Sequence, residues 1–240
     1  MSDPSPAILV TRAEPGGSQT VGRLREMGLS PILSPVLDLF ARDEAIPDLS
    51  AFGGLIFTSA NGVRFFAERS DSRDLPAWCV GPATGSEALR EGFSPVHQSS
   101  GDAYALAHYI AHHWSGDEKT LLHVANSAAR GNLRMALEAE GFDVTFLPLY
   151  EAAQAANLSE AAVRQLGSGE RTICLIHSAK GADAFLALAA DINLSKTEFV
   201  AISPQAAERL NDRPCGGVHV ASHPDEAHLM ACLTEALEAR

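Results

Sequence analysis

The sequence predicts an α/β protein built from two similar parallel-sheet domains that are joined by two linkers. Short apolar runs, such as Leu55–Phe57 and Cys174–Ile176, end abruptly in small polar residues and a glycine, and helical patterns follow them. Strands that alternate with helices form βαβ units, which assemble into parallel sheets. In addition, the strand–turn–helix stretch at 55–66 returns at 174–185, and such a repeat indicates a duplicated architecture.

The expected strands are apolar runs that turn residues bound on both sides. They cover residues 8–12, 30–37, 55–59, 78–81, 94–97, 121–127, 144–150, 174–177, 199–203 and 217–222. Between them, apolar residues that recur every three or four positions predict helices. Residues that suit helix N-caps or helix ends mark several boundaries, namely Ser18, Asp102 and Asp225 at starts and Gly28, Gly92 and Gly141 at ends.

The repeat extends beyond the first matching pair of segments. Residues 8–37 align with 121–150, residues 81–83 align with 203–205, and the helix start at Asp102 aligns with Asp225. We therefore expect two domains of one fold that face each other across a cleft, where strand-end turns from both would meet a ligand.

The repeat leaves open which segments pair in space. A tandem reading gives domains at roughly 1–115 and 119–240. A crossed reading gives a discontinuous domain 1 of residues 1–37 plus 173–240, and a domain 2 of residues 38–172 with flanking linkers. Two connections, at 38–53 and 151–171, flank one inner block and favour the crossed reading.

Composition narrows the class of protein. The chain has 240 residues, 46% hydrophobic residues and a mean hydropathy of +0.00, which is typical of a globular protein with a real core. No apolar run is long enough to span a bilayer, and the N-terminal residues lack the basic and apolar regions of a signal peptide. We expect a cytoplasmic protein without a membrane partner.

Charge and cysteine usage exclude further classes. The net charge is −12 and no basic stripe offsets it, which argues against a nucleic-acid partner. The four cysteines are scattered without a C-x-x-C pair, so we expect reduced thiols.

No cofactor signature is present in the sequence. A G-x-G-x-x-G loop, a phosphate-binding Gly-Lys-Ser/Thr loop and a G-x-S-x-G elbow are all missing. His108, His112 and His113 share part of a helix surface, but without a clear further ligand they suit a solvated helix end better than a metal site. We expect no cofactor and no metal.

Hydroxyl side chains follow several predicted strands in corresponding positions. Each one alone suits a helix N-cap, but together they indicate an anion-binding rim made by Thr11, Ser59, Thr84, Ser127, Ser178 and Ser203. The same turns hold Arg12, Arg130 and Lys180, which would supply charge to carboxylates or phosphates. The turns Ser59–Gly62 and Ser178–Gly181 add Asn61, Gly62 and Gly181 to the expected binding residues.

Tyr150 closes the predicted strand at 144–150, just before the second connection. A phenol can donate a proton or a hydrogen bond to a leaving hydroxyl. Periodicity alone favours a tyrosine with its ring in the core.

At these residues the chain resembles the uroporphyrinogen-III synthase family along nearly its whole length. The segments that carry the resemblance are Val10-Thr11-Arg12, Phe57-Thr58-Ser59-x-Asn61-Gly62-Val63, Val80-Gly81-x-Ala83-Thr84, Gly141-Phe142-x-Val144 to Leu149-Tyr150, Ile176-x-Ser178, Ala201-Ile202-Ser203-Pro204 and Ala221-x-x-Pro224. The resemblance implies two flavodoxin-like domains, a two-stranded linker and the crossed pairing.

The resemblance also implies a cofactor-free reaction on hydroxymethylbilane, a linear tetrapyrrole. Loss of its terminal hydroxyl gives an azafulvene cation, and a spiro intermediate then leads to uroporphyrinogen III with ring D inverted. Tyr150 is the acid that the resemblance implies. The family often has a threonine in the last strand-end turn, where this chain has Ser203-Pro204-Gln205, so Ser203 or Gln205 would serve that corner.

We further expect a monomer that receives its substrate from the preceding enzyme of the pathway. The alternative is a non-catalytic two-domain protein that binds a small polycarboxylate or another anion.

Overall fold

Two sheets organise the protein in the computed structural model, which describes residues 5–129 and 131–239. Unit 1 comprises the residues up to Leu39 together with those from Ala153 onward, and unit 2 is Phe40–Ala152. Unit 1 is therefore discontinuous along the chain. These units follow the segments of the crossed reading rather than those of the tandem reading.

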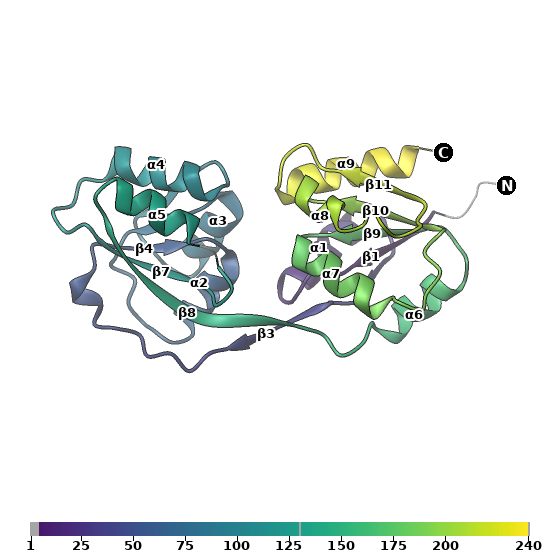
Figure 1. Ribbon diagram of the computed structural model, residues 1–240, viewed down its shortest axis with the longest axis horizontal. Coiled ribbons are helices and arrows are strands. Elements are labelled where there is room, and N and C mark those ends of the chain that lie inside the picture. Colours follow the sequence, from purple (N-terminus) through teal and green to yellow (C-terminus); the bar gives the residue numbers. More distant parts are fainter. Residues whose placement is uncertain (1–4, 130, 240) are drawn as a thin grey trace. The chain divides into compact units, whose positions relative to one another are not determined.

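Unit 1 contains a five-stranded sheet in the order β11-β10-β9-β1-β2 (Figure 1). Its strands are β1 (Ala7–Val10), β2 (Pro31–Leu33), β9 (Thr172–Ile176), β10 (Thr197–Ala201) and β11 (Gly217–Val220). Its helices are α1 (Gly16–Glu26), α6 (Glu160–Gly167), α7 (Ala179–Leu188), α8 (Pro204–Glu208) and α9 (Glu226–Glu238). All neighbouring strands run parallel, and the order is that of flavodoxin-like folds.

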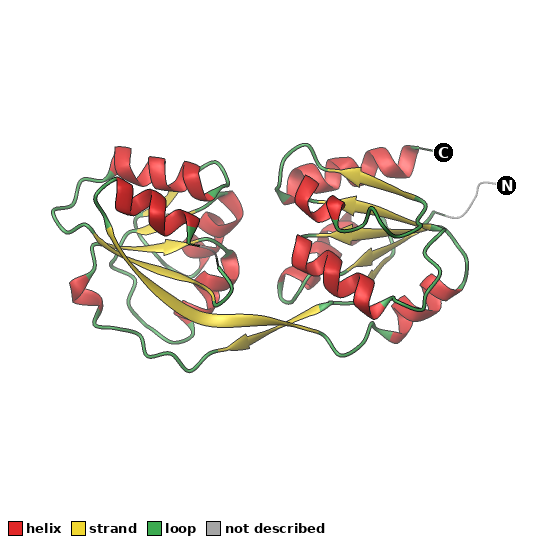
Figure 2. Ribbon diagram, viewed as in Figure 1, coloured by secondary structure: helices red, strands yellow, loops and turns green. Residues whose placement is uncertain are grey.

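Helices cover both faces of the unit 1 sheet (Figure 2). On one face, Phe185 of α7 meets Phe199 of β10 edge to face with ring centroids 5.6 Å apart. On the other face, Leu24 of α1 and Leu233 of α9 are fully buried in a second cluster. The near-continuous apolar sequence of β9 follows from this burial on two sides.

Unit 2 contains a six-stranded sheet in the order β3-β8-β7-β4-β5-β6. Its strands are β3 (Leu37–Ala41), β4 (Gly54–Phe57), β5 (Ala77–Cys79), β6 (Val96–Gln98), β7 (Thr120–Asn126) and β8 (Asp143–Gln154). Its helices are a 3₁₀ turn (Leu49–Ala51), α2 (Ala60–Ala67), α3 (Pro82–Arg90), α4 (Ala103–His113) and α5 (Asn132–Ala139). Phe66 of α2 packs on one face of the sheet, and Leu106 of α4 and Leu137 of α5 pack on the other.

The sheet orders confirm the duplication. The sequence alignment makes β7 and β8 the counterparts of β1 and β2, and β4, β5 and β6 the counterparts of β9, β10 and β11. With this correspondence, the order β8-β7-β4-β5-β6 in unit 2 repeats the order β2-β1-β9-β10-β11 in unit 1. The two units thus share one fold, but the chain enters that fold at a different strand in each unit.

The connections between the units are strands β3 and β8, which are neighbours in the sheet order. The backbone N–H of Arg42 donates to the carbonyl of Leu149, and that of Ala155 donates to Val36. In the structure, unit 2 ends at Ala152, whereas the sequence predicted that domain 2 extends to residue 172. The difference arises because Leu158 and other apolar residues around α6 pack into the unit 1 core.

Helix boundaries follow local chemistry with one correction. Asp102 and Asp225 accept hydrogen bonds from first-turn N–H groups and are N-caps as predicted. The prediction of Ser18 as an N-cap is wrong, since α1 begins at Gly16 and Ser18 lies inside it. There the carboxylate of Glu14 accepts hydrogen bonds from both the N–H and the hydroxyl of Ser18.

Candidate functional site

The carboxyl ends of the unit 2 strands gather the predicted polar residues along one edge of the sheet. Ser59, Thr84 and Ser127 follow β4, β5 and β7, which are neighbours. Because these strands are parallel, their carboxyl ends share an edge, which is where open α/β sheets bind ligands.

Tyr150 and Ser59 are the central pair of this edge. The phenol oxygen of Tyr150 lies 2.6 Å from Oγ of Ser59. Oγ of Ser59 also accepts the backbone N–H of Gly62 at 3.2 Å, so the serine is the N-cap of α2. Tyr150 as a whole is 5% exposed, and its ring stacks on Phe65 with centroids 4.9 Å apart and planes within 6°. The ring lies in the core, while its hydroxyl is held at a helix N-terminus.

Burial raises the pKa of Tyr150, and the hydrogen bond with Ser59 opposes that rise. The phenol therefore keeps its proton at neutral pH. A protonated phenol beside the positive end of a helix is suited to donating its proton.

Asn61 is held in one orientation by its neighbour in α2. Its Oδ1 accepts a hydrogen bond from Arg64 at 3.0 Å. Arg64 in turn grips the buried carboxylate of Glu87 on α3, with Nε and one terminal nitrogen at 2.8 and 2.7 Å. A guanidinium only donates hydrogen bonds, so the atom that faces Arg64 is the amide oxygen of Asn61, and its NH₂ group is the part that can donate to an anionic ligand.

Gly62 allows the first turn of α2 to approach β7 closely. A Cβ at this position would lie 2.9 Å from the carbonyl oxygen of Val124. Any larger residue would push the N-terminus of α2, and with it Ser59, away from the sheet.

The remaining unit 2 predictions have mixed outcomes. Thr84 lies inside the first turn of α3 and is buried, with Gly81 as the N-cap, so it is not itself the cap. Ser127 is exposed, and its backbone N–H donates to the carbonyl of Tyr150 at 2.8 Å. Arg130 lies outside the described residues.

The corresponding edge of unit 1 lies at the ends of β1, β9 and β10. Ser178 and Ser203 are N-caps of α7 and α8 and accept the N–H groups of Gly181 and Ala206. The hydroxyl of Thr11 instead donates to the carbonyl of Leu175 on the neighbouring strand at 2.7 Å. The side chains of Lys180 and Gln205 are exposed at the same edge, in α7 and α8.

Arg12 belongs to an ionic cluster that the sequence pattern does not reveal. Its guanidinium lies 2.9 Å from Glu226, the first residue of α9. Thr20 donates to the same carboxylate, and His177 lies 3.4 Å from it. Burial alone would raise the pKa of Glu226, but these neighbours lower it to about 2. Glu226 directly follows an N-cap, where acidic residues are ordinary, so its role carried no sequence signal.

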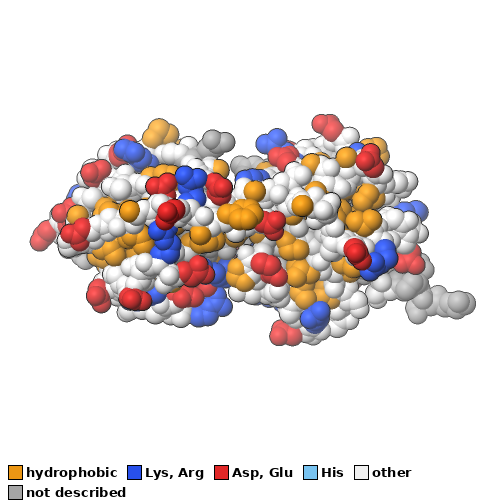
Figure 3. Space-filling view, turned by 90° about the horizontal axis from the view of Figure 1, so that it is seen from below, with side chains coloured by type: hydrophobic (Ala, Val, Ile, Leu, Met, Phe, Trp, Pro, Cys, Tyr) orange, Lys and Arg blue, Asp and Glu red, His pale blue; other side chains and the backbone are white. Residues whose placement is uncertain are grey.

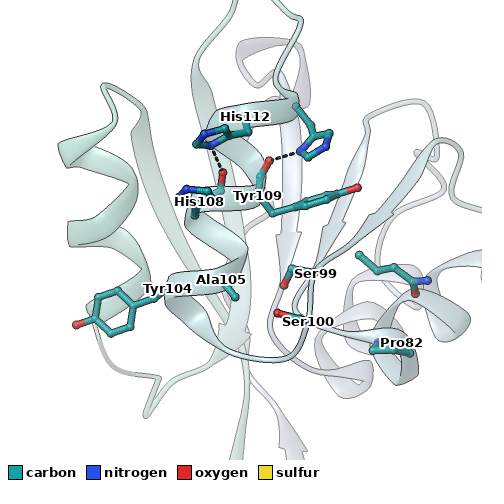
Figure 4. A pocket seen from close by; sticks show the side chains of 10 residues that line it. Pro82, Ser99, Ser100, Tyr104, Ala105, His108, Tyr109 and His112 are labelled. Carbon is teal, nitrogen blue, oxygen red and sulfur yellow. Dashed lines mark hydrogen bonds between the residues drawn. The ribbon is translucent and has the colours of Figure 1, made fainter.

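A hollow of about 830 Å³ lies along α4, the end of β6 and the first residue of α3 (Figure 4). Rings of His108, Tyr109 and His112 form one side of it, and Ser99 and Ser100 lie opposite. Nδ1 of His112 donates to the backbone carbonyl of His108 at 3.0 Å, within the helix itself. In the described part of the chain, no group of three or more His, Cys, Asp or Glu residues could hold a metal ion.

On the face that Figure 3 presents, charged side chains of both signs are mixed. Figure 3 shows Lys and Arg side chains interspersed with Asp and Glu on both units of the face it presents. Among the described residues, none of the helices combines the length and the apolar character that crossing a bilayer requires.

A sequence profile of the family described as "Uroporphyrinogen-III synthase HemD" matches residues 18–231. The "Uroporphyrinogen-III synthase" of Chlorobaculum parvum is 32% identical in an alignment of 99 residues that covers 36% of this chain and 39% of that protein. The "Porphyrin biosynthesis protein HemD" of Ruminiclostridium josui is 26% identical in an alignment of 217 residues that covers 84% of this chain and 43% of that protein. The matches thus span about two fifths of the length of either curated relative.

Solved structures support the fold. The uroporphyrinogen-III synthetase of Helicobacter pylori has a TM-score of 0.65 at 18% identity, and the comparison covers 98% of this chain and 99% of that one. A mutant uroporphyrinogen III synthase of Thermus thermophilus has a TM-score of 0.54 at 13% identity, and that comparison covers 98% of both chains. At these identities the likeness establishes the α/β fold alone.

Proposed function

The chain belongs to the uroporphyrinogen-III synthase HemD family, and we propose that it cyclises hydroxymethylbilane to uroporphyrinogen III with inversion of ring D and loss of water. The observation that carries this proposal is the pairing of Tyr150 with Ser59 at the N-terminus of α2. This pair supplies a protonated phenol, held in place by a hydrogen bond, at the edge of the sheet where ligands bind.

The first chemical step needs a proton. The bond between carbon and oxygen of the terminal hydroxymethyl group breaks, its electron pair stays on oxygen, and the Tyr150 proton completes a water molecule. The remaining azafulvene cation is attacked by ring D to form the spiro intermediate, which fragments and recloses. The ring then loses a proton, and the phenolate can take it up. The enzyme returns to its starting state and no cofactor is consumed.

The substrate carries carboxylates all around it. Backbone N–H groups and polar side chains can bind such carboxylates without a metal. In unit 2 we propose donors from Asn61, Thr84, Ser127 and Arg130, while the N–H of Gly62 is engaged with Ser59 and Gly62 serves the close approach of α2 to β7. In unit 1 we propose Arg12, Ser178, Lys180, Ser203 and Gln205, while the N–H of Gly181 is engaged with Ser178. The hydroxyl of Thr11 is engaged with Leu175, so we propose that Thr11 shapes this edge.

We also propose a cytoplasmic monomer that takes its linear tetrapyrrole from the preceding enzyme of the pathway. Size-exclusion chromatography coupled to light scattering would test the monomer. A dimer at micromolar concentration would contradict it.

The test supplies enzymatically made hydroxymethylbilane and separates the uroporphyrin isomers after oxidation. Without an enzyme, closure gives the uninverted isomer I. We expect isomer III from the parent protein, and Tyr150→Phe should lower kcat by roughly 10²-fold or more, the scale of a lost general acid. Tyr104→Phe, on the exposed face of α4, is the matched control and should keep its rate.

Isomer I alone from the parent would overturn the proposed function. Tight binding of the substrate without turnover would then favour the polycarboxylate-binding alternative. Full activity in Tyr150→Phe would remove only Tyr150 from the mechanism.

A further inference from the structure

The contact between Tyr150 and Ser59 limits where the hydroxyl protons can lie. Each hydroxyl carries one proton, and the oxygens are 2.6 Å apart. One proton must therefore lie between them, while the other points out of the pair. Oγ of Ser59 already accepts the N–H of Gly62, which leaves it one proton to donate and one lone pair.

Two arrangements satisfy this count. In the first, Tyr150 donates to Ser59, and its proton is unavailable to a substrate. In the second, Ser59 donates to Tyr150, and the phenol proton points out of the pair. Only the second arrangement lets Tyr150 act as an acid.

We propose that Ser59 is a positioning residue for Tyr150: it donates its hydroxyl proton to the phenol oxygen, turns the Tyr150 proton toward the substrate, and stabilises the phenolate that remains. This inference rests on the proposed function and assigns Ser59 to the acid, whereas the sequence pattern placed it among the carboxylate-binding residues. Atoms balance as before: the Tyr150 proton leaves with the hydroxyl as water, and a proton from the reclosed ring restores the phenol.

The surroundings favour this role. The N–H of Gly62 and the positive end of α2 both face Oγ of Ser59, which strengthens it as a donor to a developing anion. The stack on Phe65 keeps the phenol ring in place during the transfer.

Ionisable side chains on the neighbouring elements are engaged elsewhere. Glu151, the next residue of β8, pairs with Arg42. Arg64 of α2 pairs with Glu87. His123 of β7 contacts the hydroxyl of Thr58. The hydroxyl of Ser59 is therefore the group in direct contact that can lower the pKa of Tyr150 against its burial.

The sequence offers a direct test, because it contains three tyrosines and two of them lie on α4. In a Tyr104→Phe/Tyr109→Phe background, Tyr150 is the only tyrosine. Its ionisation can then be followed by tyrosinate absorbance without any substrate. We expect Ser59→Ala to raise the pKa of Tyr150 by about one to two pH units, the scale of a lost hydrogen bond to a charged group. Ser59→Thr should restore it.

Ser178→Ala is the matched control for the titration. Ser178 caps α7 through Gly181 as Ser59 caps α2 through Gly62, so both variants lose an N-cap. The control should leave the Tyr150 titration unchanged, and circular dichroism at each pH verifies that the fold persists. An unchanged titration in Ser59→Ala, or an equal shift in both variants, would overturn the proposal.

Kinetics supply the second arm. If Ser59 acts through Tyr150, Ser59→Ala lowers kcat for isomer III, and the double variant with Tyr150→Phe is no slower than Tyr150→Phe alone. If Ser59 instead binds a substrate carboxylate, Ser59→Ala raises KM, and the rate loss of the double variant is the product of the two single losses. That result would overturn the proposal. Absence of isomer III from the parent would refute the proposed function, while the titration would still report on the pair.

Discussion

Arg64 and Glu87 form a two-pronged ion pair between α2 and α3, with N···O distances of 2.8 and 2.7 Å. Their side chains are 15% and 5% exposed. Arg90 also reaches Glu87 from the surface. The pair thus ties together α2 and α3, the helices that follow strands β4 and β5.

Replacing Arg64 with Met should strongly destabilise unit 2. The change leaves the buried Glu87 carboxylate with Arg90 alone, and removing one partner of a buried pair costs about 3–5 kcal/mol. Urea unfolding would measure it. Arg164→Met, which breaks an exposed helical pair with Glu160, is the control and should cost little. Equal losses in the two variants would show that the Arg64 pair is not a buried support.

Asn61→Asp should weaken substrate binding more than Asn61→Ala does. Arg64 holds the oxygen at position 61, so the aspartate would turn its second carboxylate oxygen toward the substrate where the wild type has NH₂. Repulsion between carboxylates should raise KM for hydroxymethylbilane about tenfold, which corresponds to about 1.4 kcal/mol. Steady-state kinetics would check this. Equal KM values for both variants would remove Asn61 from carboxylate recognition.

Stability should fall as the pH drops from 6.5 to 4, partly because of His123. Burial lowers the pKa of this β7 imidazole from 6.5 to about 4. In that window the unfolded chain binds a proton there and the folded chain does not, so stability rises with pH by about 1.4 kcal/mol per unit. In His123→Gln, the free energy of unfolding should fall by about 3 kcal/mol less than in the parent protein between pH 6.5 and 4. Unfolding curves at several pH values would measure it, and parallel profiles for the two proteins would contradict the assignment.

Gly62→Ala and Gly22→Ala should change stability in opposite directions. At Gly62 the new methyl would lie 2.9 Å from a backbone oxygen of β7, and overpacking of this kind costs about 1–3 kcal/mol. At Gly22, inside α1, a methyl would meet no atom within 4 Å beyond its own helix backbone, so alanine should add about 0.5–1 kcal/mol through helix propensity. Thermal unfolding would compare them. Stabilisation by both changes would show that the close approach at Gly62 relaxes without cost.

The fold was predictable because its signals are local and repeated. Each apolar run that stops in a hydroxyl residue marks the carboxyl end of a buried strand, and Ser59, Ser178 and Ser203 all prove to be N-caps. The aligned segments then identified equivalent strands, and the two connections at 38–53 and 151–171 favoured the crossed pairing. The prediction of Ser18 as an N-cap was wrong because the carboxylate of Glu14, four residues earlier, accepts the hydrogen bond of the Ser18 hydroxyl.

The site was predictable only in part, because its contacts join residues far apart in the chain. The sequence marks Ser59 and Tyr150 separately, but their contact depends on how β8 pairs with β7 and how α2 packs on the sheet. Likewise, no local sequence pattern indicates that Arg12 forms an ion pair with Glu226 at the start of the last helix. Such partners come from tertiary packing.

The discontinuity of unit 1 affects how the protein is made. Strand β1 lies between β2 and β9, and β9 begins only at Thr172. On a ribosome, β1 and β2 therefore emerge early and wait, while all of Phe40–Ala152 is synthesised and can collapse as an independent unit. The unit whose segments are all synthesised first is thus the one in the middle of the chain, and strands β1 and β2 gain their neighbour β9 only when the C-terminal third arrives.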